Sequence, residues 1–167
     1  MKRLLPFILL ALSATLAAGP VAAHSDSHAK KSAAPSTAVM DEKSFGKPGE
    51  AKKTVRTIAV DMSDRMRFTP ATLTVKQGDT VKFVIKNSGK TMHEFVLGTM
   101  TELKTHAELM KKHPGMEHDE PYMAHVAPGR TETIVWQFTR AGEFHFGCLL
   151  PGHLEAGMVG NINVTAR

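Results

Sequence analysis

The sequence at residues 143–159 is E-F-H-F-G-C-L-L-P-G-H-L-E-A-G-M-V, and it contains the only cysteine of the chain, Cys148. His153 lies five positions after this cysteine, and Met158 lies five positions after His153. A thiolate, an imidazole and a thioether on one short loop form a soft ligand set that suits copper cycling between Cu(I) and Cu(II). Such a site needs one more imidazole, and His93, at the start of an apolar strand pattern, is its best supplier. We therefore predict a mononuclear copper site made of His93, Cys148, His153 and Met158.

The predicted ligands differ in the chemistry expected of each. The thiolate and the two imidazoles would form a roughly trigonal set, with Met158 as a weak axial ligand, which suits both oxidation states of copper. Bulky apolar neighbours, Phe95, Phe144, Phe146 and Leu150, could supply a dry shell that raises the reduction potential. A second interpretation is open for Met158, because a methionine that opens the final strand can also be an ordinary core residue.

The first 23 residues have the pattern of an export signal. Lys2 and Arg3 form a charged start, residues 4–12 are apolar, and small residues at 21–23 offer a cleavage site. The apolar run is interrupted and shorter than the roughly 20 residues that span a membrane. We expect a cleaved signal, a periplasmic mature chain that begins near His24, and no membrane span after cleavage. In an oxidising compartment a lone cysteine is a reactive thiol, half of an intermolecular disulfide or a metal ligand, and its neighbours here favour the metal.

Residues 24–53 are rich in Ala, Ser, Lys and Pro and lack apolar periodicity, which is typical of a disordered tail or linker. Cleavage after Ala23 would let His24 offer both its α-amine and its imidazole to Cu(II), with His28 nearby. The simpler interpretation is two solvated histidines. The folded domain is predicted at residues 54–167, where 13 basic side chains stand against 12 acidic ones. The net charge of +5 for the whole chain therefore gives no reason to expect nucleic-acid binding.

Short alternating patterns with turn signals between them predict strands from residue 54 onward. These patterns lie at residues 54–60, 73–75, 81–85, 95–97, 133–139, 144–148 and 158–164. Seven or eight strands at this spacing predict an all-β fold, a Greek-key β-sandwich or barrel. One short helix interrupts the series, because Thr99-x-x-Glu102 matches a capping box and helical spacing continues to His113-Pro114-Gly115. Residues 116–128 show no strand signal, and we expect a long loop there.

The middle of the chain is rich in soft ligands. Residues 92–125 contain five methionines, and four histidines besides His93. Thioethers favour Cu(I) and imidazoles favour Cu(II), so we expect a second copper site here, with Met116, His118 and Met123 as its ligands. Leu103, His106, Ala107 and Met110 form an apolar stripe at helical spacing. The ordinary alternative is therefore that His106 and Met110 belong to the core and that His113 and His118 are solvated.

These residues resemble the cupredoxins, the small blue-copper fold of plastocyanin, azurin and auracyanin. The match rests on His93 at a strand, followed by Cys148, His153 and Met158 on one loop. The spacing of four residues between the cysteine and the second histidine resembles that of azurin and auracyanin. The phrases M-H-E-F-V-L-G, M-E-H-D-E-P and L-P-G-H-L-E-A-G-M-V-G look closer still to the periplasmic copper-tolerance cupredoxins of the CopI type. The resemblance implies a cupredoxin domain at residues 54–167.

One residue departs from the family pattern. Glu94 follows the first histidine, where plastocyanin and azurin place an asparagine that organises the cysteine loop. The hydrogen-bond tuning of the thiolate that the asparagine implies is therefore not carried over to this chain.

The resemblance leaves two functions open and disfavours a third. The first is copper tolerance, in which a periplasmic protein sequesters or oxidises Cu(I) or passes copper on. The second is electron transfer, in which His153 would be the exposed electron port towards a redox-partner protein. The third is enzymatic: a copper oxidase or nitrite reductase needs His-x-His centres, and the sequence contains no such pair, so we expect no enzyme activity. The extra soft ligands favour copper tolerance, because a plain electron carrier has little use for them.

Overall fold

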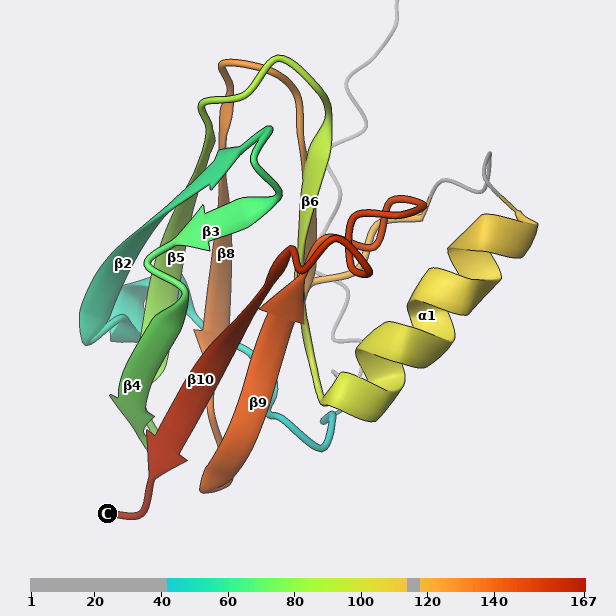
Figure 1. The fold of residues 1–167 in the computed structure, drawn as a ribbon. Coiled ribbons are helices and arrows are strands. Elements are labelled where there is room, and N and C mark those ends of the chain that lie inside the picture. Colours follow the sequence, from blue (N-terminus) through green and yellow to red (C-terminus); the bar gives the residue numbers. More distant parts are fainter. Residues whose placement is uncertain (1–41, 114–117) are drawn as a thin grey trace, which may run out of the picture. The chain divides into compact units, whose positions relative to one another are not determined.

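A computed structural model describes residues 42–113 and 118–167 of the chain (Figure 1). The described elements are β1 (Lys47–Pro48), η1 (Ala51–Lys53), β2 (Arg56–Ser63), β3 (Arg67–Thr69), β4 (Thr72–Lys76), β5 (Thr80–Asn87), β6 (His93–Gly98), α1 (Met100–Lys112), β7 (Met123–Val126), β8 (Thr131–Gln137), β9 (Gly142–Gly147) and β10 (Val159–Thr165). The predicted signal peptide at residues 1–23, and His24 and His28 behind it, lie outside the described residues. In the described part of the chain, no helix has the length and apolar character that crossing a membrane requires.

The strands form two mixed five-stranded sheets. One sheet has the order β1-β8-β5-β2-β3 and the other β4-β10-β9-β6-β7. Neighbouring strands are antiparallel except β2 with β5 and β4 with β10. Buried side chains from both sheets, Trp136, Phe83, Phe95 and Phe146 among them, form one continuous core. The predicted all-β sandwich with one inserted helix is confirmed.

Strand β6 differs from the other strands because all six of its residues are buried. Phe95 and Leu97 belong to the core between the sheets, whereas Val96 belongs to a second apolar cluster with Leu103 of α1. Side chains alternate between the two faces of a strand, so β6 is covered by the opposite sheet on one face and by α1 on the other. Figure 1 shows α1 beside the sheet that contains β6 and β9.

Helix α1 begins where the sequence predicts it. The Thr99 side chain accepts a hydrogen bond from the Glu102 backbone N–H at 3.2 Å, and the Glu102 carboxylate accepts one from the Thr99 N–H at 2.8 Å. This reciprocal pair satisfies two backbone donors that a helix start otherwise leaves free. Three residues of the predicted apolar stripe, Leu103, Ala107 and Met110, are buried. His106, the fourth member of that stripe, is only half-buried and is therefore available for other contacts.

The structure corrects the predicted start of the domain. The linker was expected to continue to residue 53, but Phe45 is only 2% exposed and stacks on Trp136 with ring centroids 5.2 Å apart. The Trp136 indole N–H donates to the Phe45 carbonyl at 3.0 Å, and β1 pairs with β8. A single aromatic residue in a polar segment leaves no periodic signal, so the sequence pattern did not reveal this attachment.

A second correction concerns the loop expected at residues 116–128. Met123–Val126 form β7, which pairs antiparallel with β6 and extends its sheet. The sequence M-A-H-V is short and contains only one polar residue between apolar ones. Its alternation of apolar and polar residues is therefore too brief to predict a strand. β7 forms at the edge of the sheet because the backbone groups of β6 supply its hydrogen-bond partners.

Candidate metal centre

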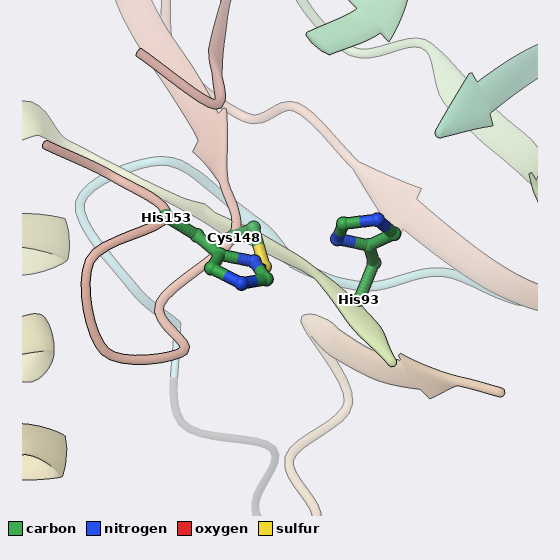
Figure 2. Close-up of side chains that lie close together, drawn as sticks. All are labelled: His93, Cys148 and His153. Atoms are coloured by element: carbon green, nitrogen blue, oxygen red, sulfur yellow. The ribbon is translucent and has the colours of Figure 1, made fainter. Parts of the chain in front are cut away.

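Three of the four predicted ligands meet at one end of the sandwich. Their donor atoms, from His93, Cys148 and His153, all lie within 4.8 Å of one another. Figure 2 shows His93 on β6 and the other two side chains on the loop that follows β9. The separation of 55 residues between His93 and Cys148 is closed by the sheet, because β6 and β9 are paired neighbours. Among the described residues this is the only such group of three or more histidine, cysteine or acidic side chains.

His93 is fully buried and presents one ring nitrogen without a partner. Its Nε2 lies 3.3 Å from Oδ1 of Asp64, while its buried Nδ1 has no hydrogen-bond partner within residues 42–113 and 118–167. The Asp64 carboxylate accepts from the backbone N–H groups of Lys90 and Thr91, and the Lys90 bond is foremost in lowering the pKa of Asp64 to about 2. An ionised carboxylate only accepts, so the proton of His93 is on Nε2 and the lone pair of Nδ1 is free for a metal.

Cys148 is fully buried and lies close to His153. Its Sγ is 3.2 Å from Nδ1 of His153 and accepts the backbone N–H of Glu94 at 3.2 Å. Burial raises the pKa of the Cys148 thiol to about 12. Metal coordination requires the thiolate, so a cation binding here must displace this proton.

The loop between Cys148 and Met158 folds back on itself. The Cys148 N–H donates to the Met158 carbonyl at 3.1 Å, and the Met158 N–H donates to the His153 carbonyl at 3.0 Å. Gly152 and Gly157 have φ angles of +85° and +89°, a conformation that side chains with a Cβ rarely adopt. These turns return the chain so that Met158, fully buried, is beside the cysteine in the backbone ladder. The axial-ligand role of Met158 stays a prediction.

Three elements outside the loop hold it in place. The Arg67 guanidinium of β3 donates to the Ala156 carbonyl at 2.8 Å. Lys111 of α1 forms an ion pair with Glu155. On the third side, the Leu149 N–H donates to Oε2 of Glu94 at 3.2 Å. The donor atoms are therefore positioned by the surrounding fold and do not depend on the loop alone.

Glu94 does more at this site than the sequence indicates. Its backbone N–H reaches the Cys148 sulfur whatever its side chain is, and its buried side chain accepts a hydrogen bond from the cysteine loop. Burial raises the pKa of Glu94, and Oε1 lies 3.2 Å from Nδ1 of His125. The glutamate thus ties the loop to β6, a role that the sequence comparison with asparagine left unassigned.

The other residues that the sequence predicts near a copper site differ in their burial and contacts. Phe95 and Phe146 are fully buried and Phe144 nearly so, while Leu150 is partly buried against the core, as expected for a dry shell. Met123 packs in the second apolar cluster on β7. Met116 lies outside the described residues. The sequence predicts His118 as a ligand together with these methionines, and in the structure its Nε2 contacts the His106 ring.

Comparison with known families agrees with this arrangement. Residues 54–165 match the model of the copper binding proteins of the plastocyanin/azurin family. The chain belongs to this family. The recognition as a cupredoxin is confirmed, and so is copper as the cofactor expected for the domain. The partnerless Nδ1 of His93 and the buried thiol of Cys148 fit that ion, and the assignment of individual ligands stays a prediction.

This cupredoxin has curated relatives named copper-resistant cuproprotein CopI. The protein from Rubrivivax gelatinosus is 51% identical over 142 residues, which cover 85% of this chain and 81% of the relative. The protein from Pseudomonas aeruginosa is 36% identical and covers 72% of this chain and 82% of the relative. The protein from Vibrio cholerae is 37% identical over 71% of both chains.

Solved structures agree on the cupredoxin fold. Dithionite-reduced auracyanin from Roseiflexus castenholzii has a TM-score of 0.58 at 21% identity and covers 67% of this chain and 98% of its own. Auracyanin B has a TM-score of 0.59 at 18% identity, with coverage of 74% and 96%. At these identities the likeness concerns the fold alone.

Proposed function

We propose that this cupredoxin binds copper through His93, Cys148, His153 and Met158 and serves copper tolerance in the periplasm. The observation that carries the proposal is the group of two imidazoles and one thiol whose donor atoms lie within 4.8 Å of one another, with His93 and Cys148 fully buried. Copper held there would supply a Cu(I)/Cu(II) couple, and the soft donor set accepts both states. The role in tolerance is supported by the name of the relatives, copper-resistant cuproprotein CopI. The periplasmic location rests on the export-signal pattern of residues 1–23.

Electron transfer to a partner protein is the second candidate. His153 is half-buried, whereas His93 and Cys148 are fully buried, so His153 is the ligand through which an electron would reach the surface. Partly buried Leu150 lies in the same loop and adds an apolar contact surface. A carrier of this kind would exchange electrons quickly and release no copper.

We propose a binding protein and not an enzyme. Copper oxidases and nitrite reductases require additional His-x-His centres, and the sequence has none. The proposal predicts no turnover of oxygen or nitrite by the copper-loaded protein beyond that of free copper.

A Cu(II) titration of the mature protein tests the site. We expect an intense visible absorption from thiolate-to-copper charge transfer, reaching its maximum at one copper per chain. A folded protein that takes up copper without this band would overturn the assignment of Cys148.

Growth on copper separates the two functions. A strain lacking the gene is complemented with the wild type or with His153→Gly, which opens the coordination position nearest the surface. Copper tolerance through binding predicts that copper sensitivity follows the copper affinity measured for each protein. Dependence on the electron-exchange rate at unchanged affinity would instead favour the electron carrier.

A further inference from the structure

Two histidines outside the predicted centre face each other at the side of the helix. Nε2 of His106, on α1, lies 2.8 Å from Nε2 of His118, in the segment that leads to β7. The ring centroids are 4.7 Å apart, and the ring planes are inclined by 41°. Among the described residues, Nδ1 of His118 is buried without a hydrogen-bond partner, and the side-chain hydrogen bond of this ring is made through Nε2.

The spacing of the two nitrogens matches a particular metal geometry. Metal–nitrogen bonds of about 2.0 Å that meet at a right angle place neighbouring donors about 2.8 Å apart, whereas tetrahedral angles place them more than 3 Å apart. Square-planar or tetragonal coordination by nitrogen and oxygen is characteristic of Cu(II). In the metal-free structure the same contact is an imidazole–imidazole hydrogen bond, in which one Nε2 donates to the other. A Cu(II) ion that replaces the shared proton would find the two nitrogens at the spacing of adjacent tetragonal ligands.

Cavities beside the two rings make these imidazoles reachable from solvent. A hollow of about 450 Å³ is lined by both histidines, and another of about 440 Å³ is lined by His118, Asp119 and His125. His118 lines both hollows, so this ring is open to a hydrated cation, and Asp119 and Glu120 follow it in the chain with their carboxylates.

His125 holds the second histidine in position. Its Nε2 lies 3.3 Å from the His118 carbonyl, and its Nδ1 lies 3.2 Å from Glu94 Oε1. In the β6–β7 register Glu94 is paired with His125, so this contact is fixed by the sheet. The ring of His118 is therefore presented by a segment that is itself anchored to β6.

We propose that His106 and His118 form a second copper site, one that takes Cu(II) from solution as the hydrated ion, with His125 as a positioning residue. The site replaces the ligand set expected from the sequence, since it keeps His118 and exchanges both methionines for an imidazole. It differs from the predicted thiolate centre in chemistry, because nitrogen and oxygen donors give a colourless to pale tetragonal ion. The site extends the proposed copper tolerance, and its signal is independent of that of the first centre.

The test is a titration of the mature protein with Cu(II), followed by EPR, visible absorption and total bound copper. We expect the His106→Gln/His118→Gln variant to bind one copper fewer than the wild type and to lose a tetragonal EPR signal with nitrogen hyperfine splitting. Its thiolate band should be unchanged, which also reports that the domain is folded. His125→Gln should weaken the second binding step without removing it.

His113→Gln is the matched control, because this exposed histidine ends the same helix and belongs to neither group. Loss of the same copper equivalent in this control would show non-specific histidine binding and overturn the proposal. Equal stoichiometry in the double variant and the wild type would overturn it as well. Absence of the thiolate band in every protein would count against the first centre and leave the second one measurable by EPR.

Discussion

The Leu149 backbone N–H donates to Oε2 of Glu94 at 3.2 Å, so the strand that carries the first imidazole also holds the loop that carries the thiol. Both groups are inaccessible to water, since Leu149 is fully buried and Glu94 is 1% exposed. A buried backbone donor without an acceptor loses the full free energy of its solvation. This contact is therefore needed for stability as well as for the geometry of the centre.

Glu94→Ala is expected to destabilise the domain by about 1–3 kcal/mol, because it leaves the Leu149 N–H without a partner. Glu94→Gln should cost less, since its amide oxygen can still accept this hydrogen bond. Urea unfolding of the copper-free proteins measures both changes. Equal stability of the two variants would show that the Leu149 contact contributes nothing.

Cys148→Ala is expected to abolish the visible charge-transfer band and leave a folded β-sandwich. The thiol is the only sulfur in the group of three donors, and the band requires a thiolate bound to copper. Visible absorption after copper addition, with far-UV circular dichroism as the folding control, checks this result. A band that persists in the alanine variant would exclude Cys148 as its origin.

Asp64→Ala is expected to lower the copper affinity of the centre about 10- to 100-fold. The carboxylate fixes the proton on Nε2 of His93, and without it the ring loses the orientation that presents Nδ1. Competition with a copper chelator gives the affinity. Asp61→Ala is a suitable control, because the Asp61 carboxylate accepts from the hydroxyl of Ser88, directly after β5, and has no hydrogen bond with His93 among the described residues.

The same carboxylate predicts a pH dependence. The folded protein lowers the pKa of Asp64 from its ordinary 3.8 to about 2, foremost through the Lys90 N–H. A depressed pKa stabilises the fold above the ordinary value, and this contribution is lost as the pH falls through about 2. The stability difference between copper-free wild type and Asp64→Ala should be constant above pH ~5 and shrink below it. A difference that does not change between pH 5 and pH 2 would contradict this assignment.

The sequence predicts the parts of the site that are local in the chain. Cys148, His153 and Met158 lie on one loop, and the capping box of Thr99 is complete within four residues, so spacing alone identifies both. Contacts that depend on strand register escape this reasoning. The Glu94–His125 pairing exists because β7 aligns with β6, and M-A-H-V has too few residues to predict a strand.

The N-terminal boundary was misplaced for a related reason. Phe45 is held by tertiary contacts with Trp136 and Tyr122, residues far along the chain. A single buried aromatic residue produces no periodic sequence pattern, and the polar residues around Phe45 resemble those of a linker. Long-range packing of one side chain, and not local propensity, sets this boundary.

The complete burial of β6 makes the alignment of this strand a condition for metal selectivity. Its side chains alternate, with His93 towards the core between the sheets and Glu94 towards the helix side. A slip of one residue would exchange the two faces and bring a carboxylate where the imidazole belongs. Oxygen donors favour hard cations such as magnesium or calcium. The preference of the site for copper therefore depends on the register of β6 with β9 as much as on the identity of the ligands.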